Sequence, residues 1–126
     1  MLKTDLHIHT NFSDGKLTPK EVLEIAKTKG LGIISVTDHD NFEGSVRMLE
    51  FNGKQEIKII PGIEISADFH GKEIHILGYF LNFNNKALIE HLDFIDNLRV
   101  VRFEKIIRKL LDLCVKIKPD NLLKKY

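Results

Sequence analysis

The chain has 126 residues, 43% of them hydrophobic and 29% charged, which suits one globular domain with a core and is too short for two ordinary domains. One cysteine excludes a disulfide scaffold, and three prolines and eight glycines exclude a collagen-like or low-complexity chain. The net charge of +1 gives no strong field for DNA, RNA or anionic lipid. Because neither a targeting segment nor a membrane-length apolar run is visible, we expect a soluble, cytoplasmic protein.

The first 37 residues predict a strand, a helix and a second strand. Residues 2–9 are expected to form the first strand. Thr18, Pro19 and Glu21 indicate a helix start, because threonine suits the N-cap, proline the first turn, and a glutamate three residues after the cap completes a capping box. Gly30 suits the position just beyond the helix end. The apolar run over 32–37 is typical of a buried strand, so this order predicts a βαβ unit with a parallel sheet.

The middle and end of the chain predict two more strand regions and two more helices. Asn41 is expected to cap a second helix over about 42–51. Residues 57–60 predict a buried strand ended by Pro61 and Gly62, residues 63–66 continue extended, and a turn at 69–71 leads into a strand over 73–81. From 88 to 113 apolar residues recur every three or four positions, which predicts one long helix with a wide apolar arc.

His7 and His9 are the first group of residues in the sequence that could bind a cation. Residues i and i+2 of a strand point to the same face, so both imidazoles can reach one cation. Taken alone, such a pair is more often two ordinary histidines on a half-exposed strand than a pair of metal ligands. Five of the six histidines lie in residues 1–75, which hold 12 acidic and 9 basic side chains, and an acidic, histidine-rich region suits a cation.

Further polar side chains follow, or end, the other predicted strands. Asp14 lies in the first loop, the segment 37–40 follows the second strand, Glu64 follows the third, and His75 lies in the next. In parallel α/β folds these positions converge on one rim, where active sites are built. Imidazoles with carboxylates and no nearby thiolate suit Mn²⁺, Fe²⁺ or Zn²⁺ in a hydrolytic site, where a carboxylate such as Glu64 can bridge two ions.

Together these motifs carry a family resemblance. The segments are Asp5-Leu6-His7-Ile8-His9-Thr10, Ser13-Asp14-Gly15, Thr37-Asp38-His39-Asp40, Pro61-Gly62-Ile63-Glu64-Ile65-Ser66 and His75-Ile76-Leu77-Gly78. They resemble the PHP (polymerase and histidinol phosphatase) superfamily, and above all its stand-alone metal-dependent phosphoesterases. The resemblance implies an α/β fold in which residues 1–85 form the N-terminal part of a distorted (β/α)7 barrel and residues 86–126 a helical insertion.

The resemblance also implies roles for single residues. The implied metal ligands are His7, His9, Asp14, His39, Glu64 and His75, and the complete family site is implied to hold two or three Mn, Fe or Zn ions. Glu64 is implied to bridge ions, and hydroxide from a water on the ions is implied to attack the phosphate, so no catalytic side chain is assigned. Of Asp38 and Asp40, one is expected to orient a ligating imidazole and the other only to cap the next helix. Arg99 and Arg102 are expected either to hold substrate phosphate or to form an ordinary solvated face with salt bridges.

The chain departs from the family pattern in one respect. Family members supply later ligands, including an Asp-x-His motif, whereas this sequence has no histidine after His91, so we expect a truncated chain that can self-associate.

Three functional hypotheses stay open for this sequence. The first is a phosphoesterase acting on nucleotides, oligoribonucleotide ends or small phosphorylated metabolites, with nucleic acid only as an oligonucleotide substrate and no membrane partner. The second is a PHP domain accessory to a DNA polymerase. The third is a fragment that binds metal without turnover.

Overall fold

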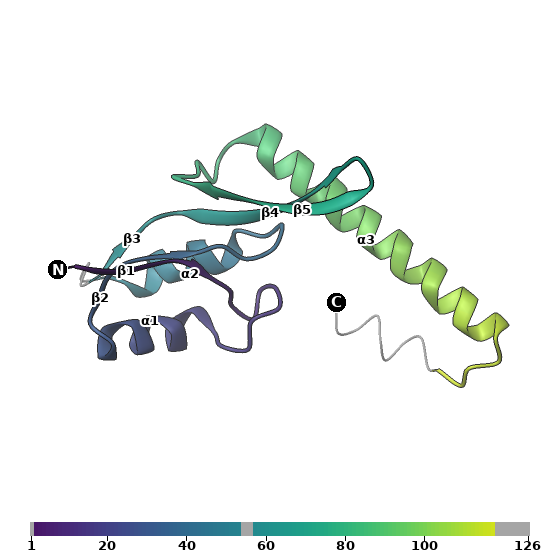
Figure 1. Cartoon of the computed structure of the whole chain (residues 1–126), viewed down its shortest axis with the longest axis horizontal. Coiled ribbons are helices and arrows are strands. Elements are labelled where there is room, and N and C mark those ends of the chain that lie inside the picture. The colour runs from purple at the N-terminus through teal and green to yellow at the C-terminus, as the bar shows by residue number, and fades with distance from the viewer. Residues whose placement is uncertain (1, 54–56, 118–126) are drawn as a thin grey trace. The chain divides into compact units, whose positions relative to one another are not determined.

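The computed structural model describes residues 2–53 and 57–117 (Figure 1). The elements in chain order are β1 Lys3–Ile8, α1 Pro19–Thr28, β2 Leu31–Val36, α2 Glu43–Phe51, β3 Lys58–Ile59, β4 Gly62–Phe69, β5 Lys72–Tyr79 and α3 Lys86–Asp112. They fall into two compact units, Met1–Asn85 and Lys86–Tyr126, which are treated separately below. None of the helices in the described ranges has the length and apolar composition that a membrane span requires.

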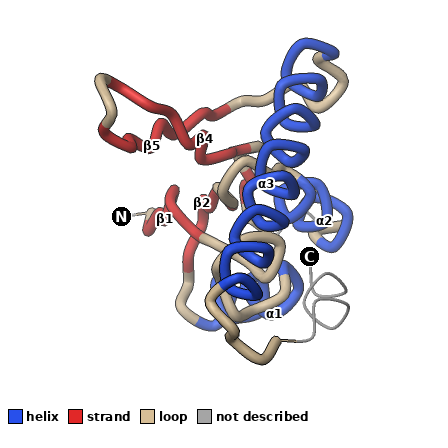
Figure 2. Tube along the Cα trace, turned by 90° about the vertical axis from the view of Figure 1, so that its right-hand side faces the viewer, coloured by secondary structure: helices blue, strands red, loops and turns tan. Residues whose placement is uncertain are grey.

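The first unit contains a three-stranded sheet of order β1-β2-β3, and both strand pairs are parallel. Figure 2 shows β1 and β2 side by side. Thr4 lies opposite Ile33 in β2, and Ile34 of β2 lies opposite Ile59 in β3. Because each connection between neighbouring strands contains a helix, the unit is built from consecutive βαβ crossovers. The predicted α/β class with parallel strands is therefore confirmed.

Helix α1 begins and ends as its sequence predicts. The Thr18 side chain accepts a hydrogen bond from the Glu21 backbone N–H at 3.3 Å, and the Glu21 carboxylate accepts one from the Thr18 N–H at 2.8 Å. This reciprocal pair satisfies two of the N–H groups that a helix start leaves free. At the other end Gly30 adopts a φ of +65°, a left-handed conformation that costs glycine little.

Helix α2 starts differently from the prediction. Asn41 was expected at the N-cap, but the N-cap is Phe42, whose side chain makes no capping hydrogen bond. The Asn41 carboxamide nevertheless accepts a hydrogen bond from the Glu43 N–H at 2.7 Å, two residues along the chain. Asn41 therefore forms an Asx turn one residue before the N-cap. The sequence alone does not distinguish an asparagine in such a turn from an N-cap asparagine.

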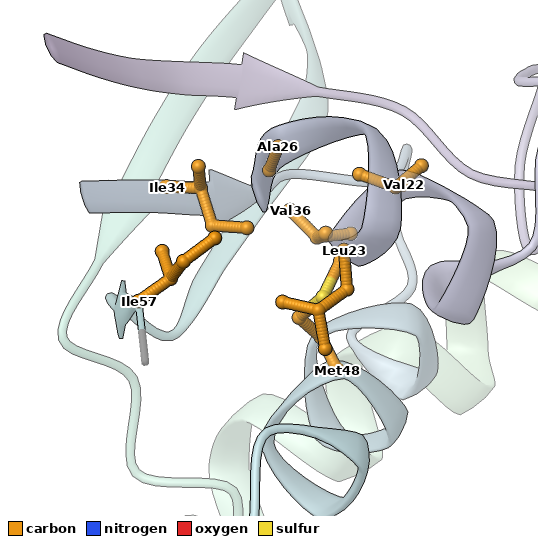
Figure 3. Close-up of a cluster of buried hydrophobic side chains, with 7 residues drawn as sticks. All are labelled: Val22, Leu23, Ala26, Ile34, Val36, Met48 and Ile57. Carbon is orange, nitrogen blue, oxygen red and sulfur yellow. The ribbon is translucent and has the colours of Figure 1, made fainter. Parts of the chain in front are cut away.

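The core of this unit lies between β2 and the two helices (Figure 3). Ile34 and Val36 point from β2 toward Leu23 of α1 and Met48 of α2, and all four are at most 1% exposed. Burying one such side chain stabilises the fold by about 1.5–3 kcal/mol. The rest of the cluster is Val22, Ala26 and Ile57. The helices thus hold β2 firmly, and with it the segment that follows its carboxyl end.

Strands β4 and β5 form an antiparallel hairpin rather than further parallel strands. Its turn is at His70 and Gly71, both with positive φ, as the predicted break at 69–71 requires. The start of β4 also pairs in parallel with the segment after β2: the Asp40 N–H donates to the Glu64 carbonyl at 2.8 Å and the Glu64 N–H donates to the Asp38 carbonyl at 3.1 Å. This pairing brings the hairpin to the carboxyl end of β2.

The second unit is dominated by α3, which runs without interruption for 27 residues, as the apolar period predicts. The assignment of residues 1–85 to part of a barrel and of 86–126 to a helical insertion stays a prediction.

Candidate metal centre

Glu64 lies at the centre of a group of four histidines. Its side chain is only 6% exposed, and its Oε2 atom lies 3.0 Å from Nε2 of His7 and 2.9 Å from Nε2 of His9. The other oxygen, Oε1, lies 3.1 Å from Nδ1 of His75. Nε2 of His39 is 3.8 Å from Oε2. A single carboxylate is therefore shared by imidazoles from four places in the sequence.

Local backbone structure explains how each imidazole arrives. His7 lies on β1 and His9 directly after it, so the two rings leave the same side of the chain. His39 follows β2 and forms a parallel bridge with Glu64 itself. His75 lies on β5 opposite Ser66, one diagonal step from Glu64 on the same face of the hairpin. The carboxyl ends of β1 and β2 thus meet the start of the hairpin, as the predicted convergence on one rim requires.

Asp14 extends the group on the side of His9. Its Oδ1 atom lies 2.7 Å from Nδ1 of His9, and its Oδ2 atom lies 3.9 Å from Nε2 of His39. The imidazoles of His9 and His39 meet edge to face, with ring centroids 4.7 Å apart, and His39 and His75 are separated by the same distance. Both ring nitrogens of His9 are therefore engaged by carboxylates on opposite sides of the ring.

The donor atoms group into three overlapping sets of three, each with its atoms within 4.8 Å of one another. The sets are His7-His9-Glu64, His9-Asp14-His39 and His39-Glu64-His75. All six ligands implied by the sequence are brought together, and none lies elsewhere. Nitrogen and oxygen donors in this ratio, without thiolate, fit a hydrolytic divalent-metal site. The residues present therefore fit the metal ions that the sequence implies, while the number and identity of those ions stay a prediction.

The electrostatics of the group favour ionised carboxylates. Burial acts to raise the pKa of Glu64, but the hydrogen bond with His7 and the charges of His39, His7 and His9 together hold it below its usual value. The pKa of Asp14 is also lowered, chiefly by its hydrogen bond with His9. The hydrogen bond with Glu73 raises the pKa of His75, with Glu64 adding to the effect. In the metal-free protein the carboxylates are thus negative and ready to bind a cation.

Asp38 and Asp40, expected to orient an imidazole and to cap a helix, have other hydrogen bonds in the structure. The Asp38 carboxylate is fully buried and accepts hydrogen bonds from Thr10 and Ser13 in the first loop. Asp40 accepts one from the Ser66 N–H of β4 at 2.8 Å. Neither provides the side-chain cap of α2, whose N-cap residue lacks one. Both carboxylates instead connect the segment after β2 to the elements that carry ligands.

Two residues near the group were missed by sequence reasoning. Glu73 places Oε1 3.3 Å from Nε2 of His75, on the ring edge away from Glu64. This contact could have been predicted from the sequence, because residues two apart on a strand, such as Glu73 and His75, lie on the same face. Thr10 donates twice to Asp38 and is fully buried, a role that sequence alone does not reveal.

Two further histidines and two arginines lie in the hairpin turn and on α3. His70 and His91 are exposed, in the hairpin turn and on α3. Arg99 and Arg102 lie on α3, and Nη1 of Arg99 is 4.0 Å from Oδ1 of Asp96. Their proposed contact with substrate phosphate stays a prediction.

Three proteins of known name are similar to this chain over part of their length. A 5'-3' exoribonuclease of Haemophilus influenzae is 40% identical over 83 residues, which are 65% of this chain and 29% of the relative. A 3',5'-nucleoside bisphosphate phosphatase of Chromobacterium violaceum is 31% identical over 102 residues, 81% of this chain and 36% of the relative. An error-prone DNA polymerase of Mycobacterium tuberculosis is 38% identical over 64 residues, 49% of this chain and 6% of the polymerase. The chain thus spans about a third or less of each of these relatives.

Two solved structures share its fold. An amidohydrolase from Chromobacterium violaceum with bound sulfate and no metal superposes with a TM-score of 0.82 and 27% identity, over 98% of this chain and 43% of that one. A protein from Bifidobacterium adolescentis, named as a metal-dependent phosphoesterase, gives a TM-score of 0.78 and 27% identity over the same shares. The family model of the PHP domain matches residues 5–119, a range that contains every ligand of the candidate centre. The chain belongs to the PHP domain family.

Proposed function

We propose that this chain carries the metal-binding part of a phosphoesterase that hydrolyses phosphate esters of nucleotides, of oligoribonucleotide ends or of small phosphorylated metabolites. The observation that carries the proposal is the arrangement of four imidazoles and two carboxylates in three overlapping sets, two of which contain Glu64. One ion needs one such set, so overlapping sets favour neighbouring ions that share a carboxylate. Two or three Mn, Fe or Zn ions are proposed, in line with the donor types.

The residues of the chain have distinct tasks in this proposal. When bound, divalent ions supply charge neutralisation at a phosphoryl group and lower the pKa of a nearby water. Glu64 directs one oxygen toward His7 and the other toward His75, and it is held in a buried position by pairing with β5 on one side and with the segment after β2 on the other. His9 presents Nε2 toward Glu64 and Nδ1 toward Asp14, so the orientation of its ring is set from both sides. Arg99 and Arg102 are proposed to hold substrate phosphate through their guanidinium groups.

The substrate class rests on the relatives. Two of them are named for hydrolysis of phosphate esters in RNA or in nucleoside bisphosphates, and they match 65% and 81% of this chain. The polymerase matches only 49%. A PHP domain accessory to a polymerase is therefore the second candidate, favoured by that match alone.

The experiment uses the 126-residue chain, purified without chelator or histidine tag. Its metal content is measured, and hydrolysis of adenosine 3',5'-bisphosphate and of a 5'-phosphorylated oligoribonucleotide is then assayed with Mn²⁺. We expect bound metal and phosphate release, both lost in Glu64→Gln and both retained in Glu50→Gln, which changes an exposed glutamate of α2. Bound metal without release of phosphate or nucleotide would contradict the enzymatic proposal and support a metal-binding fragment.

A further inference from the structure

The Asp38 carboxylate holds the loop between β1 and α1 by three short hydrogen bonds. Its Oδ1 atom accepts from the Thr10 backbone N–H at 2.6 Å and from the Ser13 hydroxyl at 2.6 Å. Its Oδ2 atom accepts from the Thr10 hydroxyl, also at 2.6 Å. Asp38 and Thr10 are both fully buried. A buried carboxylate needs such donors, because an unpaired one would lose its hydration without compensation.

The surrounding atoms determine which acceptor receives the hydroxyl proton of Thr10 and of Ser13. The Thr10 hydroxyl accepts from the Phe12 N–H at 3.3 Å, so its own proton is available for Asp38. The Ser13 hydroxyl has one proton and two carboxylate neighbours, Asp38 at 2.6 Å and Asp14 at 3.4 Å, and the shorter contact takes it. Asp38 therefore fixes the side chain of the residue directly before Asp14.

The loop is also closed tightly by its own backbone. The Thr10 carbonyl accepts from the Ser13 N–H at 3.1 Å and from the Gly15 N–H at 2.9 Å. A Cβ at Gly15 would overlap the carbonyl of His9, so the chain folds back directly onto the residue that Asp14 contacts. The position of Asp14 thus depends on a small closed loop, and the hydrogen bonds to Asp38 connect this loop to the segment after β2.

From these contacts we infer that Asp38 is a positioning residue for Asp14, and that it controls cation binding at His9-Asp14-His39 without controlling the two sets that contain Glu64. The inference deepens the proposed function and rests on it for the metal, but the loop geometry stands on its own. Asp14 belongs to only one of the three sets, whereas Glu64 is held by strand pairing that Asp38 contacts only through its backbone carbonyl.

Two substitutions test this inference. Asp38→Asn keeps the shape but adds an NH₂ group in place of one acceptor, so the Thr10 hydroxyl proton loses its partner. Ser13→Ala removes one hydrogen-bond donor and keeps the buried Asp38 carboxylate. This variant therefore still tests the inference if Asp38→Asn fails to fold. Thr28→Val is the matched control, because Thr28 is exposed and its hydroxyl bonds locally, to the Ile25 carbonyl within α1. Mn²⁺ binding is titrated by electron paramagnetic resonance, and amide hydrogen exchange of Thr10 is followed in the metal-free protein.

The expected result is selective. One class of Mn²⁺ site weakens by about 10–100-fold in Asp38→Asn and in Ser13→Ala, as for other residues that support ligands, while the remaining sites and Thr28→Val match the wild type. Thr10 amide exchange becomes faster in Asp38→Asn. Unchanged Mn²⁺ affinity in both variants, or an equal loss at every site, would overturn the inference.

A wild-type chain without Mn²⁺ binding would count against the proposed function rather than against the loop contact. In that case the exchange measurement decides: faster exchange at Thr10 in Asp38→Asn supports positioning by Asp38, and unchanged exchange refutes it.

Discussion

Nε2 of His9 lies 2.9 Å from Oε2 of Glu64, although one residue follows β1 and the other lies on β4. This contact joins the loop that carries Asp14 to the hairpin that carries His75. His9 belongs to two of the three ligand sets, whereas His7 belongs to one. The two histidines of the His-x-His motif therefore differ in the number of ligand sets to which they contribute. The motif itself does not show this difference.

This inequality gives the first prediction. His9→Ala removes a donor from two ligand sets and His7→Ala from one, so His9→Ala should reduce the bound Mn²⁺ per chain more than His7→Ala does. Elemental analysis after dialysis against a fixed Mn²⁺ concentration measures the difference. His70→Ala, in the exposed hairpin turn, is the control and should bind as the wild type does. Equal losses in His7→Ala and His9→Ala would contradict the shared role of His9.

Gly44 gives the second prediction, on stability. Within α2, alanine normally stabilises relative to glycine by about 1 kcal/mol. Here a Cβ would overlap Oδ2 of Asp38 and the hydroxyl of Thr10, two atoms that hydrogen-bond to each other. Overpacking of this kind costs about 1–3 kcal/mol, so Gly44→Ala should lower the free energy of unfolding in spite of its higher helix propensity. Urea denaturation measures this free energy, with Gly53→Ala as control, because among the described residues nothing beyond its chain neighbours lies within 4 Å of the added Cβ.

Much of the fold could be predicted because it is encoded locally. The capping box of Thr18 and Glu21, the apolar run of β2 and the break at Pro61 each depend on neighbours in the sequence. The N-cap of α2 is Phe42 and not the predicted Asn41, because an Asx turn and an N-cap use the same side chain. The antiparallel pairing of β4 with β5 was not predicted, since an apolar strand pattern carries no direction.

The ligand group could be predicted for a different reason. The family resemblance implied the six ligands, and the positions of their motifs at strand ends predicted one shared rim. The structure brings all six side chains together, while their role as metal ligands stays a prediction. The supporting residues were not predictable in the same way. Whether Asp38 faces an imidazole or the Thr10 hydroxyl depends on the path of a loop, which no periodicity specifies.

The third prediction concerns pH and the start of α1. Hydrogen bonds from the Thr18 backbone N–H and hydroxyl lower the pKa of Glu21 below its ordinary value of 4.5. A carboxylate with a lowered pKa stabilises the folded state above that ordinary value, and the contribution is lost as the pH falls through the folded-state pKa. The difference in unfolding free energy between wild type and Glu21→Gln should therefore be constant from pH 7 to about 5 and shrink below 4.5. Glu24→Gln, on the same helix, controls for the loss of a charge.

The last prediction links metal binding to folding. Cations that bind only the folded chain stabilise it by mass action, about 2.7 kcal/mol for one site at a free concentration of 100 times Kd. Adding Mn²⁺ to the chelator-treated chain should therefore raise its thermal midpoint, and excess chelator should reverse the rise. Glu64→Gln removes a charged donor from two ligand sets, so most of the rise should disappear in that variant.

Glu50→Gln, which changes an exposed side chain of α2, should keep the full rise, and this separates metal ligation from a general effect of lost charge. A rise of the same size in Glu64→Gln would mean that Mn²⁺ binds elsewhere on the chain. The Glu64 carboxylate would then be a structural partner of His7 and His9 rather than a metal ligand, because loss of a bridging ligand lowers the affinity for the ions that it joins.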